Sequence, residues 1–287
     1  MALDPGKLYA LDFPEIRQRY SWRDSVVYAL GLGFGLDPLD EGQLAFVDET
    51  KLKAVPTMAN VLAYPGFWMR HLDTGIDWVK VVHGEQAMTM HQPLPPEGEI
   101  VGRTRIVDIV DKGPGKGALV YAEREIRNGA DGVLLATLLQ TVFCRGDGGF
   151  GGKSESPRRP HPTPDRAADL SIALPTHPQL ALIYRLSGDL NPLHADPATA
   201  AKAGYERPIL HGLATYGIAG HALMKALCGY EPGRFRAIDA RFSAPVYPGE
   251  TITTDIWREG EGQAAFRCRV ADRDATVIAN GRFTYDA

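Results

Sequence analysis

The sequence predicts an α+β fold made of two similar halves, in each of which an antiparallel sheet packs around a helix. Three observations predict it. A stretch rich in Gly and Pro divides the 287 residues near their middle. Each half contains a Pro…Pro…Gly-Glu turn followed by three runs of strand-forming residues. A helical pattern precedes that turn in each half. A helix followed by a meander, twice over, indicates α+β architecture.

The dividing stretch covers residues 146–165. It is rich in Gly at its beginning and in Pro at its end, and it offers almost nothing to bury. Such a composition favours a loop or an extended connection. We therefore predict an N-terminal repeat at residues 1–150, a linker at 151–168 and a C-terminal repeat at 169–287.

The two similar turns lie at residues 92–100 and 244–252. The runs after them are rich in β-branched and aromatic residues and are separated by Gly and Asp, which is typical of an antiparallel meander. The predicted strands are residues 101–110, 118–127 and 133–143 in the first half, and 251–257, 264–270 and 276–285 in the second. The turns match with a one-residue insertion, which indicates an internal duplication.

Each half has a predicted helix before its meander. In the second half, apolar or small residues recur every three or four positions, which predicts one buried stripe of a helix. They are Ile209, Leu213, Tyr216, Gly220, Leu223 and Leu227. Gly217 and Gly220 on this helix would allow a sheet to approach closely. In the first half, residues 64–72 predict a shorter helix that starts at Pro65.

Composition excludes several classes of protein. Lys plus Arg number 31 and Asp plus Glu number 35, and a net charge of −4 gives no electrostatic support for a nucleic-acid partner. No apolar run approaches the ~20 residues of a membrane-spanning helix, and no secretory signal is visible. The three cysteines have no metal-type spacing and suit a reducing compartment.

The densest polar cluster lies at residues 184–196. Gly188 and Pro192 break regular structure there, so Asp189, Asn191 and His194 are expected on an irregular loop. A carboxylate and an imidazole five residues apart can converge as an acid–base pair. The alternative is that Asp189 and Asn191 cap turns and that His194 is a satisfied loop histidine.

Gly212 lies near the start of the second-half helix. A backbone N–H there has no partner within the helix and lies at the positive end of its dipole. It can donate to an oxygen that gains negative charge. An acid–base pair together with an amide donor is what the addition of water to an α,β-unsaturated carbonyl requires.

On these motifs the chain resembles (R)-specific enoyl-CoA hydratases of the hydratase 2 type, in the MaoC-like group of hot-dog folds. It is similar to the hydratase part of peroxisomal multifunctional enzymes of β-oxidation. The resemblance covers residues 15–287 and is most specific at residues 184–197 and 208–213. Supporting motifs lie at residues 20–24, 28–33, 82–86, 111–115, 148–152 and 240–249.

The resemblance implies a double hot-dog fold: two repeats whose sheets join, each sheet wrapping a central helix. It implies a catalytic second repeat and a first repeat that makes room for the acyl chain. Asp189 and His194 are then the catalytic pair, Asn191 positions them, and the Gly212 amide binds the thioester carbonyl. The positions implied to contact the acyl-CoA are His83, Gly84, Lys112, Leu190, Pro192, Leu193 and Phe242.

The implied reaction, in fatty acid metabolism, is the reversible hydration of trans-2-enoyl-CoA to (3R)-3-hydroxyacyl-CoA by a hydro-lyase. It needs no metal and no cofactor, since coenzyme A is part of the substrate. Three alternatives remain: a dehydratase of acyl-carrier-protein thioesters, a non-catalytic acyl-CoA-binding protein, and a hot-dog thioesterase. The absence of Asp and Glu from residues 210–227 counts against the thioesterase.

Location and assembly are further expectations. The C-terminus Phe283–Ala287 is not an S-K-L type signal, and no other targeting segment is visible, so we expect the bacterial cytoplasm. By resemblance alone we expect a homodimer, with no membrane partner.

Overall fold

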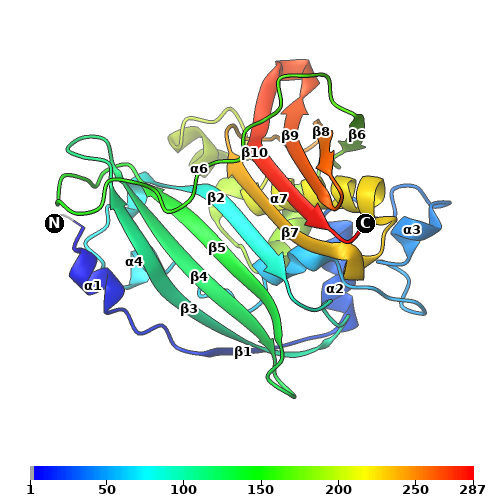
Figure 1. The fold of residues 1–287 in the computed structure, drawn as a ribbon, viewed down its shortest axis with the longest axis horizontal. Helices are drawn as coiled ribbons and strands as arrows, with labels where there is room; N and C mark the ends of the chain where they lie inside the picture. Colours follow the sequence, from blue (N-terminus) through cyan, green and yellow to red (C-terminus); the bar gives the residue numbers. More distant parts are fainter. Residues whose placement is uncertain (1–2) are drawn as a thin grey trace.

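A single curved antiparallel sheet of ten strands organises residues 3–287, the part of the chain that this computed structural model describes (Figure 1). The strand order is β1-β3-β4-β5-β2-β7-β10-β9-β8-β6. Read inward from either edge, the two halves have the same order, with β1 equivalent to β6 and β2 to β7. This symmetry agrees with the predicted duplication.

The strands are β1 (Ile16–Tyr20), β2 (Val81–Met90), β3 (Gly98–Asp111), β4 (Ala118–Asn128), β5 (Leu134–Cys144), β6 (Leu170–Pro175), β7 (Phe235–Phe242), β8 (Thr251–Gly260), β9 (Gln263–Val270) and β10 (Ala275–Tyr285).

The six predicted strands are present as β3, β4, β5, β8, β9 and β10. Sequence reasoning missed the edge strands β1 and β6 and the two central strands. The central pair, β2 and β7, joins the halves, with Ala87 opposite Asp239. Across the same seam Arg241 donates to Glu85 at 2.6 Å. Both strands contain charged and polar residues, so their sequences lack the apolar pattern that predicts a strand. These residues are present because the linker, rather than apolar core, covers one face of the seam.

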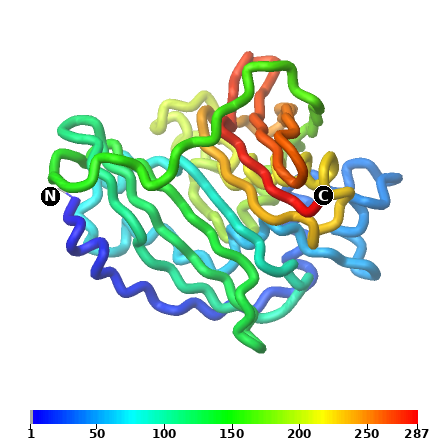
Figure 2. The backbone as a smooth tube through the Cα atoms, viewed as in Figure 1, coloured from blue at the N-terminus to red at the C-terminus, as the bar shows by residue number. Residues whose placement is uncertain are grey.

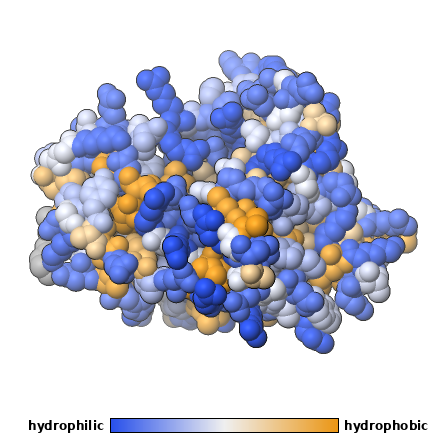
Figure 3. Space-filling model, turned by 60° about the horizontal axis from the view of Figure 1, so that its bottom comes forward, coloured by the Kyte–Doolittle hydropathy of each residue, from blue (hydrophilic) through white to orange (hydrophobic). Residues whose placement is uncertain are grey.

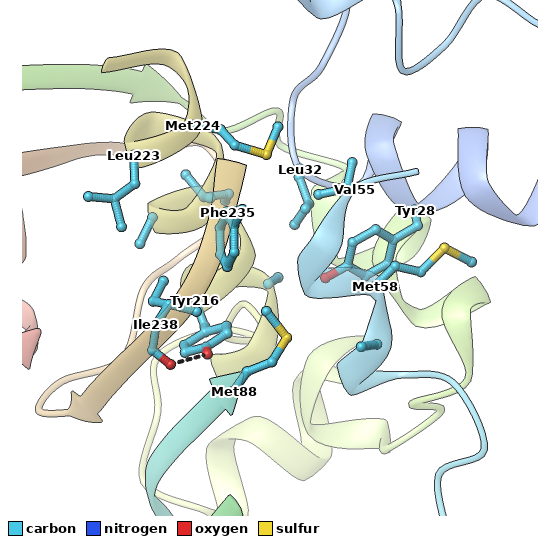
Figure 4. Close-up of a cluster of buried hydrophobic side chains, with 14 of the residues drawn as sticks. Tyr28, Leu32, Val55, Met58, Met88, Tyr216, Leu223, Met224, Phe235 and Ile238 are labelled. Atoms are coloured by element: carbon cyan, nitrogen blue, oxygen red, sulfur yellow. Dashed lines mark hydrogen bonds between the residues drawn. The ribbon is translucent and has the colours of Figure 1, made fainter. Parts of the chain in front are cut away.

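The longest helix, α7 (Gly212–Leu223), lies against the concave side of the sheet and continues into a π-helical turn at Met224–Cys228. All residues from Ala214 to Leu223 are buried. The helix is therefore buried on all sides, whereas the sequence predicted burial along one stripe only. A helix that is apolar on all sides belongs inside a core. In Figure 4 the Tyr216 hydroxyl on this helix points to β7, where it donates to the Ile238 carbonyl at 2.8 Å.

The two glycines of α7 do allow a close approach, but the segments that approach are a loop and a 3₁₀ helix of the first half rather than the predicted sheet. A Cβ on Gly217 would lie 2.5 Å from Leu32 Cδ2, and one on Gly220 would lie 2.8 Å from Thr57 Cγ2. Thr57 belongs to a short 3₁₀ helix, Pro56–Asn60. Glycine at these two positions therefore lets the first half pack directly on the central helix (Figure 4).

The first-half helix is shorter than predicted: α4 covers only Trp68–His71. Gly66 has φ of 71°, a left-handed conformation that a helix cannot include, so the segment from Pro65 stays irregular. The repeat therefore holds short helical turns where the second repeat holds α7. The remaining α-helices of the described chain are α1 (Pro5–Tyr9), α2 (Trp22–Leu30), α3 (Glu41–Leu44), α5 (Leu180–Tyr184) and α6 (Pro197–Lys202).

Residues 145–169 contain no helix or strand and run across the outer face of the sheet (Figure 2). Arg158 donates to Asp239 of β7 at 2.6 Å, and Asn280 of β10 donates to the His161 carbonyl at 2.8 Å. These bonds hold the linker against the central strands. Among the helices of residues 3–287, none combines the length and apolar character needed to cross a bilayer.

Candidate active site

The loop that carries Asp189 is held by its own polar groups. Gly188, with φ of 120°, turns the chain after a 3₁₀ helix at Arg185–Ser187. The Asp189 carboxylate then accepts the Asn191 N–H at 3.1 Å, and the Asn191 side-chain oxygen accepts the Leu193 N–H at 3.1 Å. Asn191 thereby caps the 3₁₀ turn that carries His194. The loop is irregular, as predicted, and its caps fix where both ionisable side chains lie.

His194 is 8% exposed and has one ring nitrogen engaged. Its Nδ1 lies 2.8 Å from the Ile209 carbonyl oxygen, which can only accept a hydrogen bond, so we assign the proton to Nδ1. This leaves the lone pair of Nε2 available. Burial lowers the pKa of His194 below its ordinary value, and the bond to Ile209 and the charge of Asp189 oppose this only in part. The imidazole is therefore neutral at neutral pH.

His211, at the start of α7, completes a cluster with the predicted pair. Its ring stacks on that of His194, with centroids 3.7 Å apart, and its Nε2 donates to the Asp189 carbonyl at 3.1 Å. One polar atom from each of Asp189, His194 and His211 lies within 4.8 Å of the others. The structure thus brings the predicted carboxylate and imidazole together, and His211 holds the loop in place.

An Asp and two His at this separation also have the composition of a metal site. The stacked rings argue against it, because ring-nitrogen lone pairs lie in the plane of each ring and those of stacked rings run side by side. The arrangement fits acid–base work on a bound water better than metal coordination.

Gly212 is the first residue of α7, directly after His211. The N–H groups of Ala214 and Thr215 bond the His211 carbonyl, whereas the Gly212 N–H is at a position without an intrahelical acceptor. A Cβ at Gly212 would lie 3.5 Å from the Phe242 ring. The helix therefore offers a free amide beside the Asp189–His194 pair and beside an aromatic ring.

His83 and Phe242 come from the two central strands and meet next to this helix start. Their ring centroids are 4.8 Å apart, and His83 Nε2 lies 3.0 Å from the Gln86 side-chain oxygen. Burial lowers the pKa of His83 to about 4, against the opposing charge of Asp189, which lies close enough to act on it. Gly84 forms the irregularity in β2 between His83 and Glu85.

The other predicted contact residues lie at the surface. Leu190 is 63% exposed, Pro192 is exposed and Leu193 is partly so. Lys112 is exposed in the turn after β3. The Asp111 carboxylate accepts N–H bonds from Gly113, Gly149 and Gly151, so this turn is tied to the start of the linker. Within residues 3–287, no hydrogen bond or ion pair joins the Lys112 side chain to the Asp189 loop.

A cavity in the first half opens beside α7, in the repeat that the resemblance implies makes room for the acyl chain, although the sequence did not predict which residues line it. Its enclosed volume is about 30 Å³, and the space is about 370 Å³ when the open mouth is included. The lining includes Leu213, which follows Gly212, and Gln86, which bonds His83. The other lining residues are Asn60, Tyr64, Pro65, Trp68, Thr104, Ala122, Arg124, Leu138 and Gln140. The Pro65-Gly66 break was the one sequence signal for this space, since it prevents a helix from filling it.

Two family models match consecutive parts of the chain: the MFE-2 hydratase 2 N-terminal domain over residues 18–146 and the MaoC like domain over residues 160–280. The chain is 41% identical to 3-hydroxyacyl-thioester dehydratase Y of Mycobacterium tuberculosis over the full length of both. The chain belongs to the MaoC-like hydratase 2 family. This MaoC-like chain is also 35% identical to a peroxisomal enoyl-CoA hydratase 2 of Arabidopsis thaliana, covering 95% of this chain and 92% of the relative.

Solved structures agree with this assignment. A MaoC-like dehydratase from Phytophthora capsici matches 99% of this MaoC-like chain and 100% of its own, with a TM-score of 0.87 and 34% identity. A Mycobacterium tuberculosis protein described as a double hot-dog fold matches 95% of the chain with a TM-score of 0.55 and 13% identity, which supports the fold. The predicted family, fold class and enzyme class, a hydro-lyase, are confirmed.

Proposed function

We propose that this chain catalyses the reversible hydration of trans-2-enoyl-CoA to (3R)-3-hydroxyacyl-CoA. The observation that carries the proposal is the convergence of the Asp189 carboxylate and the His194 imidazole within 4.8 Å, beside the start of α7. Family membership supports the general activity, and the geometry of these groups supports the mechanism.

In the proposed mechanism the Asp189 carboxylate and His194 Nε2 bind one water molecule. A carboxylate and the lone pair of a neutral imidazole both accept hydrogen bonds, so they can take the two O–H groups of that water and turn its lone pairs toward Cβ of the substrate. The water oxygen bonds to Cβ as one proton passes to the pair, and the pair delivers a proton to Cα. The two groups act as a unit, and the proton cannot be assigned to either alone.

The Gly212 amide is the proposed partner of the thioester carbonyl oxygen. Attack at Cβ pushes electron density onto that oxygen, and a fixed N–H at the positive end of a helix stabilises the developing charge. Phe242 packs against Gly212 and helps keep water away from this bond. The acyl chain then extends past Leu213 into the first-half cavity, which is the proposed role of the N-terminal repeat.

The test mixes the purified protein with trans-2-enoyl-CoA of four to sixteen carbons and follows the loss of the conjugated absorbance. The product is then offered to an R-specific 3-hydroxyacyl-CoA dehydrogenase. We expect hydration to the R product. An S product, or no hydration at any chain length, contradicts the proposal, and free thiol release would indicate a thioesterase. The same acyl groups on carrier protein give a second series of kcat/KM values, which decides between the two carriers.

We expect the acid limb of the pH profile to lie below the ordinary histidine range. The reaction needs neutral His194, so activity is present above the pKa of this residue and is lost as pH falls through it. Because burial lowers that pKa, the pH at which kcat/KM falls to half of its plateau value should lie below 6.5, the ordinary pKa of histidine. Initial rates between pH 4 and 9 check this, and an acid limb centred above pH 6.5 contradicts it.

Three further predictions accompany the proposal. The reaction should need no added metal or cofactor, and the location should be the bacterial cytoplasm.

The chain should form a homodimer, although on the face shown in Figure 3 the apolar side chains lie in separate patches among hydrophilic ones. Sedimentation measurements of the purified chain test the last of these.

A further inference from the structure

A buried arginine without a counter-ion lies in the first-half cavity. Arg124 on β4 is 8% exposed, and its Nη2 donates to the Asn60 carbonyl at 2.6 Å. Its Nε is buried without a hydrogen-bond partner, and no ion pair involves Arg124 within residues 3–287. The carbonyl and the Tyr64 ring, 5.3 Å from the guanidinium carbon, carry no formal charge that could balance it.

The neighbouring glutamates do not neutralise this charge. Side chains alternate across a strand, so Glu123 and Glu125 lie on the opposite face of β4 from Arg124. Each is already paired there: Arg105 lies 2.5 Å from Glu123, and Arg127 lies 2.9 Å from Glu125. Burial lowers the pKa of Arg124 to about 10, which still leaves it charged at neutral pH.

The cavity that holds Arg124 lies next to the proposed reaction site. The same cavity is lined by Arg124 and by Leu213, the residue after Gly212. Tyr64 lines the same cavity. Burial raises the pKa of Tyr64, the charge of Asp189 raises it further and the charge of Arg124 lowers it, so this phenol lies within range of both. An acyl group that enters beside Leu213 therefore extends toward a buried cation.

We propose that Arg124 binds a carboxylate at the far end of the acyl group, so that the favoured substrates are trans-2-enoyl thioesters with a terminal carboxylate rather than a terminal methyl. This proposal rests on the proposed function and names its substrate class. A guanidinium offers planar, paired donors that match a carboxylate. Thr104 and Gln140 in the same lining can donate further hydrogen bonds to it.

Desolvation explains why the preference should be strong. Arg124 has already lost its water on folding, so a carboxylate supplies the partner that the buried charge lacks. A terminal methyl would fill the same space and leave the guanidinium unpaired. Sites with buried polar groups reject substrates that cannot pair with them.

The experiment compares kcat/KM for trans-2-enoyl-CoA of six and eight carbons ending in a carboxylate with the methyl-ended compounds of equal length. The wild-type protein should favour the carboxylate by about 10- to 100-fold at one or both lengths, which corresponds to a charge-assisted hydrogen bond. In Arg124→Met this ratio should fall to about one or below. Arg127→Met, on the outer face of the same strand, should keep the wild-type ratio.

The outcomes separate the two proposals. If neither the carboxylate-ended compounds nor methyl-ended substrates of any length from four to sixteen carbons are hydrated, the proposed function fails. If methyl-ended substrates are hydrated but the wild-type protein shows no preference for the carboxylate, the Arg124 proposal is overturned. If Arg124→Met lowers both activities equally while thermal melting shows a folded protein, Arg124 has only a structural role and the proposal is again overturned.

Discussion

Replacing either member of the pair, as Asp189→Asn or His194→Gln, is expected to lower kcat/KM for enoyl-CoA hydration by about 10²- to 10⁴-fold, the usual range for a lost acid–base group. Asn and Gln keep the size and the polar character of the side chains but cannot exchange the proton. Asn at position 189 retains an oxygen that can accept the Asn191 N–H, so the loop should keep its conformation. Initial rates with each purified variant measure the effect.

Two conservative changes at the surface serve as controls. Asp131→Asn alters an exposed turn, and His91→Gln alters an exposed histidine directly after β2. Both should retain the wild-type rate. Near-normal turnover by Asp189→Asn or His194→Gln, in a protein whose circular dichroism and melting curve match the wild type, would remove the proposed site.

The second large effect concerns the backbone at the start of α7. Gly212→Pro deletes the N–H that we propose as the donor to the thioester carbonyl, and we expect kcat to fall by about 10²- to 10³-fold. Proline suits the first position of a helix, and His211 before it has ψ of 136°, which is compatible with a following proline. The helix should therefore form normally, and circular dichroism can check this.

Gly212→Ala is the matched control, because it adds a methyl group and keeps the N–H. Its Cβ would lie 3.5 Å from the Phe242 ring, an ordinary van der Waals contact. We expect its kcat to stay within a few-fold of the wild type. Equal losses of kcat in both variants would point to crowding by the added carbon atoms, and a fully active Gly212→Pro would exclude the oxyanion role.

Much of the fold could be predicted because its signals are local. The strands after each Pro…Gly-Glu turn follow from β-branched residues and turn residues within ten positions of each other. The Gly- and Pro-rich linker follows from composition alone. The central strands were missed because β7 carries Arg236, Asp239 and Arg241, whose partners lie in β2, in the linker and at the C-terminus.

The candidate site divides in the same way. Asp189 and His194 lie within six residues, so one turn-rich segment was enough to predict that the carboxylate and the imidazole converge, while Asn191 between them caps the turn. The role of His211 depends on two contacts made across the fold, with the His194 ring and with the Asp189 carbonyl. Nothing near His211 in the sequence specifies either contact.

The sequence alone determined the two-repeat α+β plan, the irregular Asp189–His194 loop and a free amide at Gly212, because each depends on residues close together in the chain. Only the tertiary structure decided that α7 is buried on all sides and that Tyr64 and Arg124 share a cavity with Leu213. Those features arise where the two halves pack on one helix. Burial and charge balance there depend on every segment that packs around a side chain, so they are properties of the whole fold.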